Sequence, residues 1–134
     1  MKLIPYGRQY IDKDDIFQVS KILRKDKITT GDQVNKFEKK INNYLNCLYS
    51  TTCNSGTSAI FLSMQAIGLS KDDVVIMPSV NFIASYNAAK ILGAKIYLAD
   101  VNKFTGQMSP QDVEACCKKF NLRKAKAIIV MYNG

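Results

Sequence analysis

The amino-acid sequence predicts an α/β fold in which a mainly parallel sheet is flanked by helices. Short apolar runs alternate along the chain with longer segments whose apolar residues recur every three or four positions. Glycine follows two of the longer segments, at Gly68 and Gly93, where it is typical of helix ends. Such alternation is typical of parallel sheets with right-handed crossover connections.

Two helices are expected in residues 1–46, ahead of βα units in residues 47–134. Asp12, with Asp15 three residues later, has the pattern of an N-terminal helix cap, and the apolar residues that follow share one helical face. After a loop at 27–31, a second helix is indicated by apolar residues at three-and-four spacing, namely Val34, Phe37, Ile41, Tyr44 and Leu45.

The βα units follow in a regular order. The predicted elements are a strand at 48–52, a helix at 57–67, a strand at 74–77, a helix at 83–92, a strand at 95–99, a helix at 110–120 and a strand at 127–131. The run 74–77 is continuously apolar, as expected of a strand buried on both faces. Ser109, Pro110 and Asp112 combine a capping serine, a proline at the first helical position and an acid three residues after the cap.

Composition excludes several classes of protein. Hydrophobic residues make up 47% of the chain and charged residues 22%, as in ordinary globular domains. No apolar run approaches the roughly 18 residues of a membrane-spanning helix, and no secretory leader is recognisable, so a cytoplasmic location is expected. Without histidine and without a C-x-x-C pair, no metal site is expected, and the four cysteines are expected to be reduced.

The formal net charge is +8, and three explanations are open. The basic residues lie on solvated helix faces, attract an anionic ligand or bind nucleic acid. The sequence favours solvated faces, because the charges are spread along the chain and no nucleic-acid-binding motif accompanies them.

The turn at 54–58, Asn-Ser-Gly-Thr-Ser, is the first candidate binding site. Free backbone N–H groups at a helix N-terminus suit a phosphate, and Gly56 lets an anion approach the backbone. The alternative is that the hydroxyl groups only cap the helix. The turn matches neither a P-loop nor a dinucleotide-binding glycine motif.

Two further candidates follow predicted strands. Phe82 could stack on a flat heterocycle, or it could pack into the core. Asp100 could bind a ligand hydroxyl, or it could cap a turn.

Seven short motifs, taken in order, resemble one known family. They are Ile28-Thr29-Thr30-Gly31 before Phe37-Glu38, Asn54 to Ala59, Asp73 to Pro78 with Phe82, Asn87-Ala88, Gly93-Ala94-Lys95, Asp100-Val101 and Lys126 to Ile129. In this order they resemble the N-terminal part of the DegT/DnrJ/EryC1/StrS family of nucleotide-sugar aminotransferases, which use pyridoxal 5'-phosphate (PLP). The resemblance implies the N-terminal portion of the large domain of the aspartate-aminotransferase fold (PLP fold type I).

The resemblance also implies roles for individual residues. Gly56, Thr57 and Ser58 match positions that hold the cofactor phosphate, and Phe82 matches the aromatic residue that stacks on the pyridine ring. Tyr6, Thr29 and Thr30 resemble stretches that approach the substrate or a partner subunit. Members transfer an amino group from a donor such as glutamate to a nucleotide-linked keto sugar, in amino-sugar and surface polysaccharide biosynthesis, and a homodimer is implied.

The chain also departs from the family pattern. The motif of the lysine that holds the cofactor as a Schiff base is missing, so no catalytic residue is assigned here, and residues 1–134 are expected to be a partial PLP-binding large domain that is inactive alone. Met131 stands where many members have histidine. The alternative is a non-catalytic α/β module that binds an anionic metabolite or a partner chain.

Overall fold

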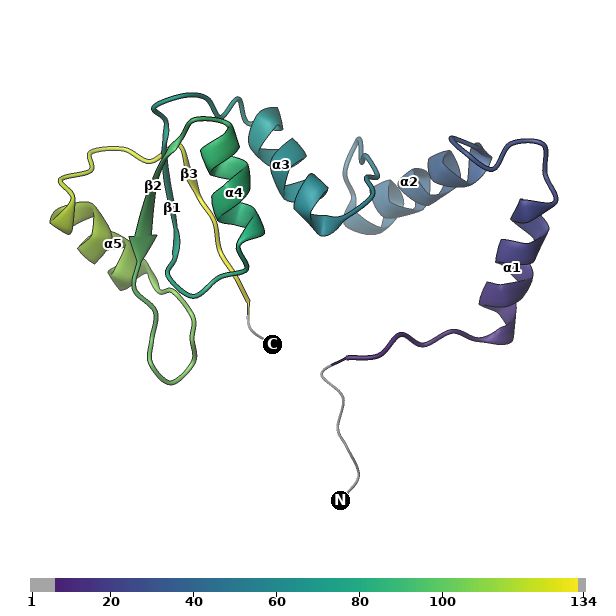
Figure 1. Ribbon diagram of the computed structural model, residues 1–134, viewed down its shortest axis with the longest axis horizontal. Helices are drawn as coiled ribbons and strands as arrows, with labels where there is room; N and C mark the ends of the chain where they lie inside the picture. The colour runs from purple at the N-terminus through teal and green to yellow at the C-terminus, as the bar shows by residue number, and fades with distance from the viewer. Residues whose placement is uncertain (1–6, 133–134) are drawn as a thin grey trace, which may run out of the picture. The chain divides into compact units, whose positions relative to one another are not determined.

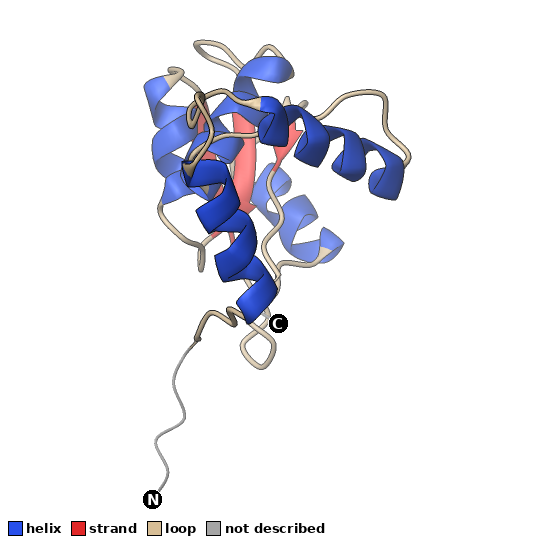
Figure 2. Ribbon diagram, turned by 90° about the vertical axis from the view of Figure 1, so that its right-hand side faces the viewer, coloured by secondary structure: helices blue, strands red, loops and turns tan. Residues whose placement is uncertain are grey.

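The computed structural model describes residues 7–132 and divides the chain into two compact units (Figure 1). Unit 1 is Met1–Thr52 and unit 2 is Cys53–Gly134. Unit 1 contains helices and loops, whereas unit 2 contains every strand of the described chain. The strands are drawn in red in Figure 2. Within the described residues no helix is both long and apolar enough to cross a membrane.

Unit 1 contains the two predicted helices, α1 (Lys13–Leu23) and α2 (Asp32–Leu45). Asp12 caps α1 as the sequence predicts. Its carboxylate accepts a hydrogen bond from the Asp15 N–H at 3.0 Å, and the Asp15 carboxylate accepts one from the Asp12 N–H at 3.1 Å. No side chain of either helix is buried within the described structure.

The predicted strand at 48–52 is wrong, because this segment is a loop. Its polar groups bond to Glu38 of α2 instead of to a neighbouring strand. The Ser50 hydroxyl donates to the Glu38 carbonyl at 3.0 Å, and the Thr52 N–H donates to Glu38 Oε1 at 2.8 Å. β-Branched and aromatic residues favour a strand only where a partner strand completes the hydrogen bonds, and Glu38 takes that place here.

Unit 2 is an α/β sandwich, which confirms the predicted fold class. Its elements are α3 (Gly56–Ala66), β1 (Val74–Pro78), α4 (Ala84–Ile91), β2 (Lys95–Ala99), α5 (Pro110–Lys119) and β3 (Ala127–Ile128). The strands form one parallel sheet in the order β2-β1-β3, with Val74 opposite Lys95 and Val75 opposite Ala127. The helix boundaries lie close to those predicted from apolar spacing and caps.

The central strand β1 is buried on both faces, as its apolar run predicts. Val75 and Met77 pack on one face against Met64 of α3 and Ala88 and Ala89 of α4. On the other face Ile76 packs with Ala99 of β2 and Cys116 of α5. The sheet therefore lies between α3 and α4 on one side and α5 on the other (Figure 1).

The last strand is shorter than the predicted 127–131, and Pro78 explains where it stops. Val74 and Ile76 direct their carbonyl groups toward β3, accepting from Lys126 N–H at 2.8 Å and Ile129 N–H at 2.9 Å. Pro78 is the next residue of β1 on that side, and proline has no N–H to donate. The ladder between β1 and β3 therefore ends.

We predict that Ser109→Ala lowers the free energy of unfolding by about 1 kcal/mol, since it removes an N-cap. Ser109 Oγ accepts from the Asp112 N–H at 3.3 Å and donates to the Asp112 carboxylate at 2.6 Å. The hydroxyl and then the N–H of Ser109, which both donate to the Asp112 carboxylate, lower the pKa of Asp112 below its ordinary value of 3.8. Their stabilisation is therefore present above pH 3.8 and is lost as the pH falls through the lowered pKa.

Urea unfolding at pH 7 and in strong acid measures both effects. Ser79→Ala is the control, because the structure gives this exposed side chain no hydrogen bond among the described residues. Equal stability of the two variants at pH 7 would contradict the assigned cap.

Candidate functional site

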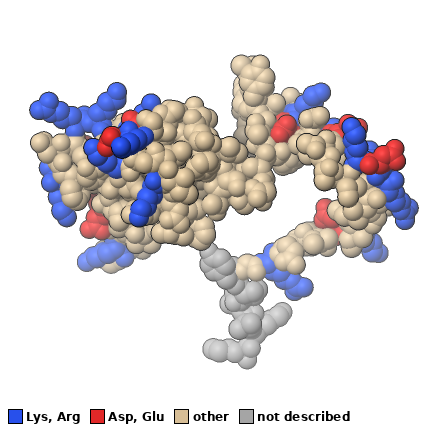
Figure 3. Space-filling view, turned by 45° about the horizontal axis from the view of Figure 1, so that its top comes forward, with Lys and Arg blue, Asp and Glu red and all other residues tan. Residues whose placement is uncertain are grey.

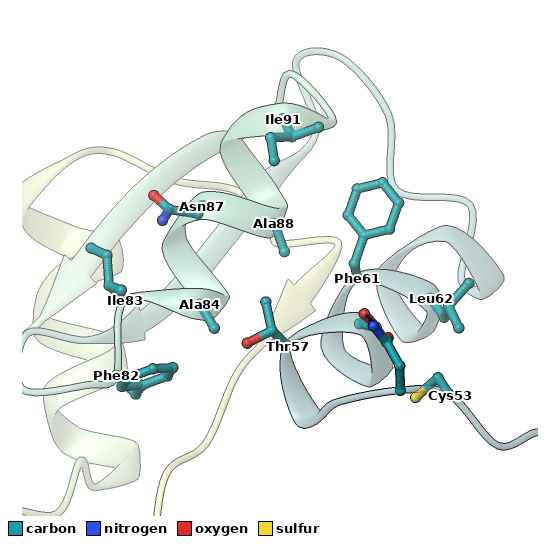
Figure 4. Close-up of a pocket in the computed structure, with 12 residues that line it drawn as sticks. Cys53, Thr57, Phe61, Leu62, Phe82, Ile83, Ala84, Asn87, Ala88 and Ile91 are labelled. Atoms are coloured by element: carbon teal, nitrogen blue, oxygen red, sulfur yellow. Dashed lines mark hydrogen bonds between the residues drawn. The ribbon is translucent and has the colours of Figure 1, made fainter.

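A pocket between α3 and α4 brings together most of the predicted cofactor-binding residues (Figure 4). We call it the α3–α4 pocket; its volume is about 660 Å³. It is lined by Cys53, Asn54, Thr57, Ser58, Phe61, Leu62, Phe82, Ile83, Ala84, Asn87, Ala88 and Ile91. Gly56 is not among the lining residues but precedes Thr57 in the first turn of α3.

Some of the hydroxyl groups at the start of α3 form hydrogen bonds within the chain, and one does not. Ser55 is the N-cap, and its hydroxyl accepts from the Ser58 N–H at 3.2 Å. The Ser58 hydroxyl donates to Asn54 Oδ1 at 2.7 Å. Among the described residues, the Thr57 hydroxyl and the N–H groups of Gly56 and Thr57 have no hydrogen-bond partner. The capping alternative therefore accounts for Ser55 and leaves Thr57 available to a ligand.

Gly56 leaves open space beside these N–H groups. Apart from its two chain neighbours and the backbone of its own helix, no described atom lies within 4 Å of where a Cβ would stand, so tertiary packing does not require glycine here. The partial positive charge of a helix N-terminus and unpaired N–H groups favour an anion. This arrangement suits an anion such as phosphate, and a side chain at position 56 would compete with it for the space.

Phe82 is 66% exposed, so the alternative in which it packs into the core is wrong. It lies in the turn between β1 and α4, and Figure 4 shows it and Thr57 on facing sides of the α3–α4 pocket. An exposed ring that faces the free donors at the start of α3 suits a ligand that combines a flat heterocycle with an anionic group. Asp100, by contrast, is not in the pocket, and its Oδ1 accepts from the Val101 N–H at 2.8 Å, as a turn cap does.

The rest of the pocket wall was not predicted from single motifs. On α4 it consists of Ala84, Asn87, Ala88 and Ile91, and on α3 of Phe61 and Leu62, which follow the predicted Thr57 and Ser58. Each of these residues lies three or four positions from another lining residue of the same helix, as residues on one helical face do, and this spacing could have identified them from the sequence. Asn87 adds a polar group to the α4 wall, and Asn54 is the acceptor that orients Ser58.

The residues expected near a substrate belong to unit 1. Thr29 and Thr30 lie in the loop between α1 and α2, and Thr30 lines a shallow hollow of about 520 Å³ with basic neighbours that include Lys25 and Lys27. Thr30 has a φ of 50°, which is strained for a β-branched residue. Tyr6 lies outside the described residues.

The fold and the site together define the class of the protein, because solved aminotransferases share this architecture. An aminotransferase from Psychrobacter cryohalolentis superposes with a TM-score of 0.80 at 25% identity, covering 94% of this chain and 32% of that one. A structure of a Streptococcus pneumoniae sugar aminotransferase in its PMP form gives a TM-score of 0.81 at 26% identity, covering 95% and 31%.

Residues 9–133 match the DegT/DnrJ/EryC1/StrS aminotransferase family, and the chain belongs to this family. It is 34% identical over 132 residues to the UDP-4-amino-4,6-dideoxy-N-acetyl-beta-L-altrosamine transaminase of Campylobacter jejuni strain 81-176, covering 98% of this chain and 35% of the relative. It is 35% identical to GDP-perosamine synthase of Escherichia coli O157:H7, covering 98% and 36%. The chain thus spans about a third of the length of these relatives.

We predict that the thiols of the native chain react with Ellman's reagent in two phases. Cys47 and Cys53 are exposed and free and should react first, whereas Cys116 is 5% exposed and should react only on unfolding. Burial, and then the neighbouring Cys117, raise the pKa of the Cys116 thiol, which further lowers its thiolate fraction.

Stopped-flow absorbance with the native and the urea-unfolded chain measures the phases, and Cys53→Ser assigns the pocket thiol. A single rate for all thiols in the native chain would contradict the described burial.

Proposed function

We propose that the protein is a PLP-dependent aminotransferase that acts on a nucleotide-linked keto sugar in amino-sugar and surface polysaccharide biosynthesis. In this proposal, residues 1–134 contribute the part of the large domain that holds the phosphate and the ring of PLP. One observation carries it: the unpaired donors of Thr57 and the exposed ring of Phe82 face each other across the α3–α4 pocket. The names of the relatives support the substrate class, and the PLP and PMP forms of the S. pneumoniae enzyme support the cofactor.

The start of α3 would bind the phosphate. The N–H groups of Gly56 and Thr57 and the Thr57 hydroxyl can donate to phosphate oxygens without breaking any hydrogen bond described within the chain. The Ser58 hydroxyl donates to Asn54 and would have to turn to join them. The α3 dipole adds to the attraction.

Phe82 and the apolar wall of α4 would orient the ring and exclude water from one of its faces. Ala84 and Ala88 are small, so a flat ring can approach α4 closely. When bound, PLP supplies an electron sink for the amino-transfer chemistry. Glutamate as amino donor, a homodimer, and contact of Tyr6, Thr29 and Thr30 with the substrate remain parts of this proposal.

The covalent attachment of PLP would not come from the pocket described here. No lysine lines the α3–α4 pocket among the described residues. We therefore expect the 134-residue chain to show no transaminase turnover with a nucleotide-linked keto sugar and glutamate. Turnover by the purified chain would contradict this part of the proposal.

We predict that Thr57→Ala weakens binding of PLP by about tenfold, because it removes a donor to a charged phosphate. Equilibrium dialysis of the purified chain with PLP measures the affinity. The matched control is Ser63→Ala on the same helix. Among the described residues the Ser63 hydroxyl bonds only to the Ala59 carbonyl, at 2.8 Å, and it lies outside the pocket. Equal affinities of the two variants would remove Thr57 from the site.

We predict that Phe82→Leu weakens PLP binding roughly two- to tenfold and leaves inorganic phosphate binding unchanged, because only the ring is stacked. Competition between phosphate and PLP in the same dialysis measures both affinities. A parallel loss for the two ligands would contradict stacking. Binding of phosphate with no preference for PLP would favour the alternative of a module that binds anionic metabolites.

A further inference from the structure

The amino ends of the three strands meet at one edge of the sheet in unit 2, which we call the amino edge. The first residue of β1, Val74, lies opposite Lys95 of β2, and its carbonyl accepts from the Lys126 N–H, just before β3, at 2.8 Å. The Lys95 N–H donates to the Asp73 carbonyl at 2.8 Å. These contacts bring segments that are far apart in the sequence onto one surface.

Most basic residues of unit 2 lie at this edge or in the last turn of α5, which leads back toward it. They form the amino-edge patch, which consists of Lys71, Lys95, Lys118, Lys119, Arg123, Lys124 and Lys126. All of these side chains are exposed. The acids beside them are Asp72, Asp73 and, one turn before Lys118 on α5, Glu114. The space-filling view shows more Lys and Arg than Asp and Glu on the visible face of unit 2 (Figure 3).

Stabilisation of the fold explains only part of this charge. Lys118 and Lys119 complement the dipole at the end of α5, and the Lys95 ammonium pairs with Asp72 at 3.0 Å. The remaining members, Lys71, Arg123, Lys124 and Lys126, lie in loops, and no described ion pair within 4 Å involves them. Hydrogen bonds with Ser70 lower the pKa of the Asp73 carboxyl group, and Lys126 and Lys124 help to lower it from longer range. Like charges held together on a folded surface repel, so an anionic partner would relieve that repulsion.

The composition of the patch favours lipid phosphates over nucleic acid. It contains one arginine, Arg123, whereas the others are lysines, which act as point charges without the planar fork that reads phosphates and bases. Phe120, the exposed ring that follows Lys119, already has the Lys119 ammonium 5.4 Å from its centroid and the Tyr97 ring at 5.1 Å, so a base that stacked on it would compete with these contacts. Clusters of four to eight lysines or arginines beside a membrane-spanning helix or on an amphipathic helix bind anionic phospholipid, and the amino-edge patch gathers as many charges in loops and at the end of α5.

We propose that the amino-edge patch docks the protein on the surface of a bilayer that contains anionic phospholipid. The α3–α4 pocket follows the carboxyl end of β1, at the opposite edge of the sheet, so docking leaves it accessible. The contact is electrostatic and lies at the level of the headgroups. It therefore weakens as salt rises, with a range of about 10 Å at 0.1 M salt.

The test is sedimentation of the full 134-residue chain with vesicles of phosphatidylcholine alone or with 30 mol% phosphatidylserine, each at about 0.1 M salt. We expect binding to the anionic vesicles only. The triple variant Lys119→Gln, Lys124→Gln, Lys126→Gln should lose roughly a hundredfold in partition coefficient. The matched control, Lys36→Gln, Lys39→Gln, Lys40→Gln, removes the same charge from exposed positions of α2 and should lose less than about threefold.

Circular dichroism establishes that both variants are folded. Because the two variants have the same net charge, a difference between them reports the position of the charges that were removed. Equal losses in the two variants would overturn the proposal, because net charge alone would then explain binding. Failure of the unmodified chain to distinguish the two vesicle types would also overturn it. Tighter binding to a mixed-sequence DNA duplex than to the anionic vesicles at the same salt would assign the patch to nucleic acid instead.

Discussion

The strand β1 is buried on both faces, and the arrangement of unit 2 follows from this constraint. Val75, Ile76 and Met77 are at most 1% exposed, and successive residues of a strand point to opposite faces. Each face therefore needs its own helical layer, supplied by α3 and α4 on one side and α5 on the other. Parallel pairing then requires the chain to cross back between strands, which places the loop after β1 and the start of α4 at one edge.

The two edges of the sheet differ in chemistry: the α3–α4 pocket lies at the carboxyl ends of the strands, and the amino-edge patch lies at their amino ends. Within the described part of the chain, no lysine or arginine lines the α3–α4 pocket, which offers backbone N–H groups and hydroxyls instead. The basic side chains gather at the amino edge, around Lys95 and Lys126. An anion in the pocket would thus be held by short, directional donors, which select for shape, whereas the amino edge offers charge that acts at longer range.

Local signals in the sequence predicted the helices and their caps well. The Asp12 and Ser109 caps and the continuously apolar β1 depend on neighbours within a few residues, so spacing was sufficient. The segment 48–52 could not be predicted in this way, because whether it pairs as a strand depends on Glu38, which competes for its donors. Similarly, the sequence could nominate Thr57 and Phe82 separately, but only the packing of α3 on α4 places them across one pocket.

The candidate site is organised before any ligand arrives, because its hydroxyl groups have separate tasks. Ser55 satisfies the Ser58 N–H, and Asn54 holds the Ser58 hydroxyl, so the first turn of α3 is fixed by its own hydrogen bonds. The Thr57 hydroxyl takes no part in that network. A ligand that bonds to Thr57 and to the free N–H groups therefore need not order the turn, and the entropic cost of binding is lower. The turn is held by the hydrogen bonds of Ser55 and Asn54 and needs no side chain at position 56. Because Gly56 has no Cβ, an anion can reach the backbone there.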